Sequence, residues 1–228
     1  PLTFREYLAF RGINLPARPR LAASPARMQH ALTDYLRWGG FPEVVLARDD
    51  VRKEALLKQY FDDILFKDVA LRHEVRDLPA LRALAVYLMT QTASLVSAQR
   101  VARQIGISVD FARACFSHLE EAFLVQLLPS FSLKAAERAR NPQKVHAVDS
   151  GLRNAVCITA SPDRGRLAET AVVAAMRRMA NAGLYYWKAG REVDILLRRG
   201  NTARIAVQVC FDASDTAVTL TFPNRPSR

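Results

Sequence analysis

Four pieces of sequence between residues 165 and 210 decide the fold. They read GRLAETAVV (165–173), LYYWK (184–188), REVDILL (191–197) and IAVQVC (205–210). Helical spacing separates the apolar residues of the first piece and its continuation, which are Leu167, Ala171, Val172 and Ala175. The other three pieces are short runs rich in β-branched, aliphatic or aromatic residues, a composition typical of strands. The pattern predicts a helix followed by three strands.

Polar residues stand at defined points of this pattern. The predicted helix carries Glu169, the second strand carries Asp194, and the last strand carries Gln208 and Cys210. This order resembles the restriction-endonuclease-like core known as PD-(D/E)XK. The resemblance implies clustered carboxylates that hold Mg²⁺, a hard cation that takes oxygen ligands, and a Glu-x-Lys strand whose lysine activates a water. Gln208-Val209-Cys210 stands in the place of that strand motif, so one carboxylate and the lysine are missing from it.

We therefore expect a nuclease-like fold with a degenerate site. If the chain were a nuclease, Glu169 and Asp194 would be its metal ligands, and Gln208 would join them as a catalytic residue. The alternative is that Glu169 caps or pairs on its helix and that Asp194 is a vestigial acid of the core. Cys210 is expected to be a buried strand thiol rather than a nucleophile, because no histidine stands near it in a readable motif.

Composition limits the class of protein. A length of 228 residues and an apolar fraction of 50% suffice for one large or two small domains. The formal net charge of +11 favours contact with phosphate backbones or with an acidic partner surface. Neither a disulfide framework nor a cysteine metal site is expected from the cysteines, which are Cys115, Cys157 and Cys210. Metal binding is not expected either from the scattered histidines, which are His30, His73, His118 and His146.

The sequence contains neither a signal peptide nor an apolar run long enough to span a bilayer. We expect a reduced, cytoplasmic protein with no membrane partner. The chain starts at Pro1 without a methionine, which predicts that it begins inside a longer protein.

Residues 1–92 are predicted to form a helical bundle. Thr3 and Glu6 fit a capping box at the start of the first helix. Further helices are expected over 25–38 and 50–72, and another is expected to begin at Pro79. No glycine-rich phosphate loop occurs in the sequence, so this chain cannot bind ATP by that device.

Residues 93–149 are predicted to form a winged helix. A short helix over 97–105, a turn at Gly106 and a second helix over 109–122 precede two expected strands, at 123–131 and 145–149. Arg113 lies on the second helix, and the expected hairpin tip carries Lys134, Arg138, Arg140 and Lys144. These five residues are the candidate phosphate contacts. The alternative for the tip is a solvated loop. Asp149, which ends the region, is expected to form a turn or a helix cap.

The whole pattern resembles the C-terminal region of prokaryotic AAA+-type ATPases, a domain of unknown function that follows the ATP-binding core. The pieces that carry the resemblance are PLTFREYL (1–8), GGFPEV (39–44), Tyr60 with FKDV (66–69), LEEAFL (119–124), VDSGL (148–152), LAET (167–170) and REVD (191–194). The resemblance covers nearly the whole chain, from Pro1 to about Asp212. It implies a missing ATPase core, a winged helix and a nuclease-like module. ATP would then bind only through the missing core.

The expected fold class is α+β, with a helical region at 1–92, a winged helix at 93–149 and a small mixed-sheet PD-(D/E)XK-like domain at 150–228. The leading functional hypothesis is a non-catalytic module that binds DNA or a protein. The first rival is a metal-dependent nuclease, with Mg²⁺ as its cofactor. The second is an interaction domain that docks on its own ATPase core. Without the nuclease activity, no cofactor is expected in this chain.

Overall fold

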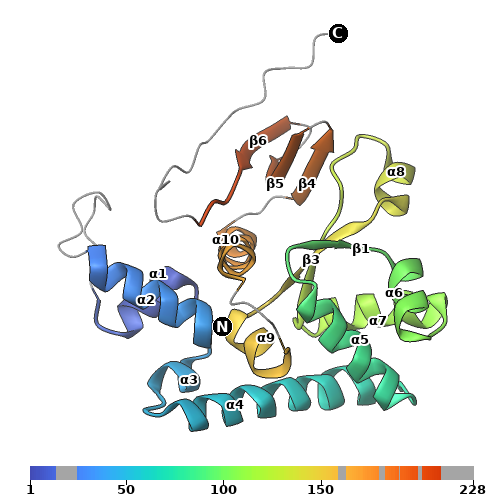
Figure 1. The fold of residues 1–228 in the computed structure, drawn as a ribbon. Coiled ribbons are helices and arrows are strands. Elements are labelled where there is room, and N and C mark those ends of the chain that lie inside the picture. The colour runs from blue at the N-terminus through green and yellow to red at the C-terminus, as the bar shows by residue number, and fades with distance from the viewer. Residues whose placement is uncertain (14–24, 159–162, 180–182, 190, 200–201, 212–228) are drawn as a thin grey trace.

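The computed structural model describes residues 1–13, 25–158, 163–179, 183–189, 191–199 and 202–211 (Figure 1). The architecture is α+β, with helices and small antiparallel sheets. In chain order the elements are α1 (Phe4–Phe10), α2 (Pro25–Trp38), α3 (Pro42–Leu46), α4 (Asp50–Asp63), η2 (Ile64–Leu71), α5 (Leu78–Thr90), β1 (Ser94–Val96), α6 (Ala98–Ile105), α7 (Val109–Glu121), β2 (Val125–Leu128), α8 (Ala135–Arg140), β3 (Gln143–Ala147), α9 (Ser150–Val156), α10 (Arg164–Met179), β4 (Gly183–Ala189), β5 (Arg191–Arg199) and β6 (Thr202–Val207). Among the described helices, none combines the length and the apolar character needed to cross a membrane.

The amino-terminal helices begin where the sequence predicts. Thr3 accepts a hydrogen bond from the backbone N–H of Glu6, and the Glu6 carboxylate accepts one from Thr3 N–H, which completes the predicted capping box. Asp77 caps α5 by accepting the N–H of Ala80. The long helix expected over 50–72 is present, but it changes character after Asp63, where α4 continues as the π-helix η2. Figure 1 shows α4 as a long rod along one edge of the molecule.

The largest hydrophobic core lies between these helices and the first sheet. It includes Phe61, Leu65, Leu84, Leu119, Val145 and Leu152. Leu152 belongs to α9, which contacts α2, α4 and α5. The expected division of the chain at residues 92 and 149 stays a prediction, and the packing of α9 crosses the second of these boundaries.

Asp149 links the two sides of that boundary. Its carboxylate accepts the N–H of Leu152 and so caps α9, as expected. Its other oxygen accepts the N–H of Gly40, from the turn after α2, at 2.7 Å. Gly39 adopts a φ of 75° there, and a Cβ on it would lie 2.0 Å from the Asp149 carboxylate. Two distant sequence pieces, around residues 39–44 and 148–152, are therefore one packed junction.

The first sheet has the strand order β1-β3-β2 and is antiparallel throughout. The pair α6 and α7 joins β1 to β2, with Ser97 and Ser108 as N-caps and Gly106 in the left-handed conformation between the helices. The strands expected at 123–131 and 145–149 are present but shifted. The connection between them is not a bare hairpin tip, because it contains α8.

The second sheet has the order β4-β5-β6, and α10 lies beside it (Figure 1). Both of its pairings are antiparallel, so the expectation of a mixed sheet is wrong for the described strands. Within the described residues, one isolated parallel bridge joins Ser130, beyond β2, to Tyr186 in β4. A small core packs under this sheet and includes Leu128, Val173 and Ile195.

The last expected strand ends early. β6 stops at Val207, so Gln208 and Cys210 lie beyond it. Cys210 is exposed, and the expectation of a buried strand thiol is therefore wrong. The ladder ends because the backbone N–H of Val209 turns to the carboxylate of Asp194 instead of a neighbouring strand.

Candidate functional site

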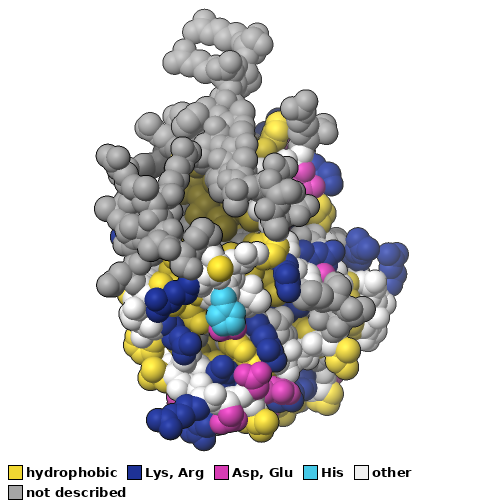
Figure 2. Space-filling model, turned by 60° about the vertical axis from the view of Figure 1, so that its left-hand side comes forward, with side chains coloured by type: hydrophobic (Ala, Val, Ile, Leu, Met, Phe, Trp, Pro, Cys, Tyr) yellow, Lys and Arg dark blue, Asp and Glu magenta, His cyan; other side chains and the backbone are white. Residues whose placement is uncertain are grey.

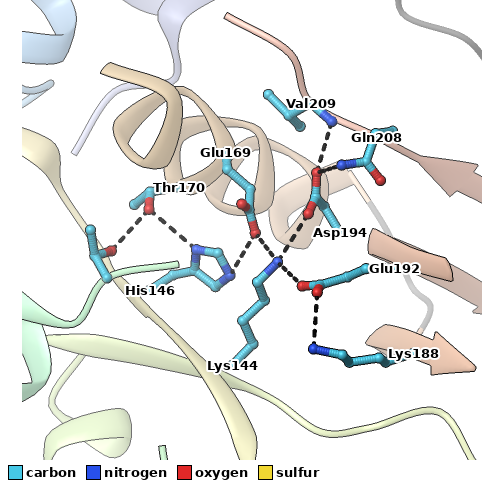
Figure 3. A network of polar contacts seen from close by, with 10 residues as sticks. Lys144, His146, Glu169, Thr170, Lys188, Glu192, Asp194, Gln208 and Val209 are labelled. Atoms are coloured by element: carbon cyan, nitrogen blue, oxygen red, sulfur yellow. Dashed lines mark hydrogen bonds and ion pairs between the residues drawn. The ribbon is translucent and has the colours of Figure 1, made fainter. Parts of the chain in front are cut away.

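A cluster of charged side chains lies between the two sheets and α10 (Figure 3). β3 is the central strand of its sheet, and it presents Lys144 and His146 on one face because side chains two apart in a strand share a face. α10 contributes Glu169, and β5 contributes Glu192 and Asp194. The helix and strand that were expected to carry acids therefore do bring Glu169 and Asp194 to one place.

Lys144 is the centre of this cluster. Its Nζ lies 2.8 Å from Glu169 Oε1, 3.0 Å from Asp194 Oδ1 and 3.3 Å from Glu192 Oε1. Its side chain is only 3% exposed. The expectation that Lys144 lies at an exposed basic tip is therefore wrong in placement. The cause is that β3 begins at Gln143, which puts Lys144 inside the sheet.

Asp194 has partners on both of its oxygens. Oδ1 accepts the ammonium of Lys144, while Oδ2 accepts the side-chain amide of Gln208 at 2.6 Å and the backbone N–H of Val209 at 3.0 Å. In the nuclease alternative, Gln208 would join Glu169 and Asp194 as a catalytic residue. It instead donates its amide nitrogen to Asp194, and it reaches the cluster from beyond the end of β6.

Two threonine hydroxyls and an imidazole form a chain of buried polar contacts next to Glu169. The Thr92 and Thr170 hydroxyls lie 2.9 Å apart, and Thr92 also accepts the backbone N–H of Ala147. His146 Nδ1 lies 3.2 Å from the Thr170 hydroxyl, and His146 Nε2 lies 3.7 Å from Glu169 Oε1. This side of the site is fully buried, so the positions of Glu169 and His146 are fixed by packing.

Burial and neighbouring charges shift the protonation of these groups. Burial raises the pKa of Glu169 to about 7, and the carboxylates of Asp194 and Glu192 add to this, against the opposing effect of Lys144. Burial lowers the pKa of Lys144, but the ion pairs with Glu169 and Asp194 outweigh it, and the net shift is upward. Burial, Lys144 and Arg177 lower the pKa of His146 to about 3, so its imidazole is neutral. One ammonium thus faces three carboxyl groups, and one of these holds a proton near neutral pH.

The donor set does not fit Mg²⁺ as the residues stand. A hard cation needs carboxylate oxygens that face it without other partners. Lys144 Nζ already lies among the oxygens of Glu169, Asp194 and Glu192, and Asp194 has no oxygen left over. The Lys144 ammonium thus lies among the three carboxylates, where a cation that they held together would have to lie.

A second polar surface is a hollow of about 380 Å³ at the start of α6. Arg113 of α7 and Arg138 and Arg140 of α8 line it, together with the first residues of α6. Three of the five candidate phosphate contacts are therefore brought together. The other two are not: Lys134 forms an ion pair with Glu137 outside the hollow, and Lys144 lies in the buried cluster.

Charge on its own does not mark this hollow. Figure 2 shows Lys and Arg side chains spread among acidic and hydrophobic ones over the face in view. What sets the hollow apart is that three arginines line one concave surface and that their charges are only partly neutralised. Arg113 contacts Asp110 at 3.5 Å, Arg138 donates to the carbonyl of Ser132, and Arg140 has no ion pair within the described residues.

Sequence reasoning did not identify Lys144, His146, Thr170 or Glu192 as members of the cluster. One signal was available for two of them, because Lys144 and His146 alternate with Val145 and Ala147 along a strand. That alternation gives a shared face for Lys144 and His146. It does not say what packs against that face.

Comparison with known proteins identifies the family. Residues 29–163, more than half of the chain, match the domain of unknown function DUF8612. The uncharacterized protein MJ1544 of Methanocaldococcus jannaschii is 30% identical over 225 residues, which cover 95% of this chain and 49% of that protein. An uncharacterized protein of Haemophilus influenzae is 26% identical over 218 residues, which cover 93% of this chain and 52% of that protein. No solved structure matches. The chain spans about half the length of these curated relatives, and by its match over residues 29–163 it belongs to the DUF8612 family.

Proposed function

We propose that this chain binds the phosphate backbone of duplex DNA through the hollow at the start of α6, and that it does not cut the DNA. The observation that carries the proposal is the convergence of Arg113, Arg138 and Arg140 on one hollow. Guanidinium groups bind phosphate oxygens in bidentate pairs, so three of them around one hollow match two or three phosphates of a backbone.

The backbone around the hollow supports the same reading. α6 begins at Ala98, and Ser97, its N-cap, accepts the N–H of Arg100. The N–H groups of Ala98 and Gln99, which have no acceptor within the helix, lie at the hollow beside the arginines. The start of a helix favours anions because its N–H groups and its dipole both present positive charge. In this proposal α6 and α7 act as the helix pair of a winged helix, and the segment that carries α8 acts as its wing.

The carboxylate–lysine cluster supports the non-catalytic part of the proposal. A metal-dependent nuclease has to hold a cation and position a water, and Lys144 takes the cation's place. One observation favours the nuclease alternative, which is that Lys144 puts an ammonium beside Glu169 and Asp194. We therefore treat cleavage as the outcome that would reverse this part of the proposal.

The remaining half of the curated relatives leaves room for another domain. We propose that in the whole protein this region follows an ATP-binding core of the AAA+ type, on which it could also dock. Sequencing the gene upstream of Pro1 tests this directly. A phosphate-loop motif in that sequence supports the proposal, and its absence from a complete gene contradicts it.

Binding is tested by measuring duplex affinity over a range of salt concentrations. Each phosphate contact contributes about −0.9 to the slope of log K against log salt. The double variant Arg138→Ala/Arg140→Ala should bind more weakly and flatten the slope by roughly one to two units. The matched control Arg5→Ala/Arg48→Ala removes the same charge from exposed arginines elsewhere, and its slope should stay near that of the wild type. Equal slopes for the two double variants contradict the proposed contact.

Cleavage is tested with the same duplex, and with single-stranded DNA, in the presence of Mg²⁺ or Mn²⁺. We expect both substrates to remain intact. Metal-dependent cleavage that disappears in Asp194→Ala would favour the nuclease instead.

A further inference from the structure

A third polar cluster lies apart from both sites, where the end of η2 meets α7. His73 lies in the turn after η2, and His118 and Glu121 lie one turn apart on α7. One nitrogen of each imidazole and one carboxylate oxygen all lie within 4.8 Å of one another. The two rings are stacked, with 3.7 Å between their centroids. The expectation that the histidines are scattered is wrong for this pair.

One nitrogen of each ring has no hydrogen-bond partner among the residues that the structure describes. His73 Nε2 and His118 Nδ1 are buried without a hydrogen bond. The nearest acidic oxygen, Glu121 Oε2, lies 3.7 Å from His73 Nε2, which is too long for a hydrogen bond. Buried polar atoms are nearly always paired, and an unpaired one calls for an explanation such as an ordered water or an ion. Here two such atoms belong to neighbouring rings of one cluster.

The Glu121 carboxylate is held beside His73. The Ser117 hydroxyl donates to Glu121 Oε1 at 3.2 Å, which leaves Oε2 directed to His73. Partners of this kind fix ligating carboxylates in metal sites.

We propose that His73, His118 and Glu121 bind a divalent transition-metal cation, with Zn²⁺ as the closest match. Two imidazole nitrogens and one carboxylate oxygen suit zinc, copper or nickel better than Mg²⁺ or Ca²⁺, which take oxygen ligands. A tetrahedral zinc ion has ligand bonds of about 2.0–2.2 Å, so its ligand atoms lie roughly 3.3 Å apart. A metal ion lies in the plane of each imidazole that ligates it, and the two rings are stacked at an interplanar angle of 16°, so they have to rotate out of the stack as well as close on the ion.

The surroundings allow a cation to enter and to act as a clamp. The Glu121 side chain is 56% exposed and that of His73 is 19% exposed, so the site opens to solvent. A bound ion would join the end of η2 to α7, the helix that also carries Arg113. In this proposal the ion has a structural role, because it stabilises the packing of α7 against the end of η2. This role does not depend on the proposed DNA binding.

The test uses Co²⁺ alone, added to the intact chain with the exposed thiol removed as Cys210→Ser. We expect one equivalent to bind, with visible absorption bands, and Zn²⁺ to displace it. His73→Ala and His118→Ala should each lower the affinity by about 100-fold or more, and Ser117→Ala by about 10-fold. His30→Ala, an exposed histidine on α2, is the matched control and should bind as the parent does.

A second readout keeps the test independent of folding defects in the variants. Saturating Zn²⁺, at about 100 times its dissociation constant, should raise the Tm of the parent and of His30→Ala by roughly 5–10 °C. It should leave the Tm of His118→Ala unchanged. The proposal is overturned if Co²⁺ does not bind at 100 µM, or if binding survives in both His73→Ala and His118→Ala. It is also overturned if binding is lost only in Asp194→Ala, which would assign the ion to the carboxylate–lysine cluster.

Discussion

Two regions of the molecule are dense in charge. One is the carboxylate–lysine cluster of Lys144, Glu169, Glu192 and Asp194, and the other is the hollow lined by Arg113, Arg138 and Arg140. Their charges are arranged in opposite ways. In the cluster, Lys144 is buried among three acids that neutralise it, and each atom of Asp194 that can accept a hydrogen bond does so. In the hollow, Arg113, Arg138 and Arg140 line an open surface, and Arg140 has no ion pair within the described part of the chain. Only the second arrangement leaves charge for a partner.

The difference shows that the number of charged residues is a poor guide to a binding site. A buried ion pair costs desolvation of both groups, and this cost is offset only by close mutual contact. The charges of such a pair therefore neutralise each other and are not available to an outside partner. Exposed arginines keep most of their hydration and gain more from a phosphate than from weak surface ion pairs.

The largest effect should come from Lys144→Met. The substitution keeps much of the side-chain volume but leaves three carboxyl groups in a buried site without a cation. Breaking a buried ion pair from one side costs about 3–5 kcal/mol of unfolding free energy, which urea unfolding at pH 7.5 would measure. Lys188→Met is the matched control, since Lys188 contacts the same Glu192 at 3.4 Å but is 59% exposed. We expect less than about 0.5 kcal/mol for it, and similar losses in the two variants would mean that Lys144 does not hold the cluster together.

Glu169→Gln should change how stability depends on pH. Because the folded pKa of Glu169 is about 7 and its ordinary value is 4.5, the folded state keeps a proton that the unfolded state releases between these values. The contribution of Glu169 to the free energy of unfolding of the wild type therefore falls as pH rises from about 4.5 to 7, by up to about 1.4 kcal/mol per pH unit. The glutamine variant lacks this fall. Urea unfolding at several pH values between 4.5 and 7.5 measures it, and parallel curves for the two proteins would contradict the raised pKa.

The local structure could be predicted from sequence, whereas the site could be predicted only in part. Thr3 with Glu6, Asp149 and Gly106 each act locally, so their roles as caps and turns follow from a few neighbouring residues. The helix with Glu169 and the strand with Asp194 were also predictable. Lys144 was not, because it comes from a different sheet, and nothing in its neighbourhood specifies that β3 faces α10 and β5. It stands in a run of basic residues, which favoured an exposed tip.

A similar limit explains the histidines. His73 and His118 meet because η2 and α7 pack in one core, and long-range packing of that kind leaves no spacing in the sequence. For Gln208 the sequence prediction was wrong about local structure, because Gln208 does not lie in a strand. Strand alternation predicted its direction, but β6 ends one residue earlier, and the chain turns so that Gln208 and Val209 both donate to Asp194.

A double-mutant cycle of Gln208→Ala and Asp194→Asn should give a coupling free energy of roughly 1 kcal/mol. The Gln208 amide donates to the buried side chain of Asp194, but Gln208 is itself exposed, and the Val209 N–H donates to the same oxygen. Both facts reduce the coupling below that of a fully buried charged hydrogen bond. Urea unfolding of the four proteins measures it. Additive losses would show that Asp194 is held by Lys144 and the backbone without help from Gln208.

The smallest expected effect is that of Arg113→Ala on DNA binding. Arg113 differs from Arg138 and Arg140 because Asp110, one turn earlier on α7, lies 3.5 Å away and offsets part of its charge. Its removal should flatten the salt slope by less than about 0.9, the value of one full phosphate contact. Asp110→Ala, which frees Arg113, should strengthen duplex binding slightly and steepen the slope. If Arg113→Ala instead flattens the slope as much as the Arg138→Ala/Arg140→Ala pair, the main contact lies on α7 rather than on α8. If neither Arg113→Ala nor Asp110→Ala changes the slope, Arg113 does not contact the DNA. The contact then consists only of Arg138 and Arg140 on α8.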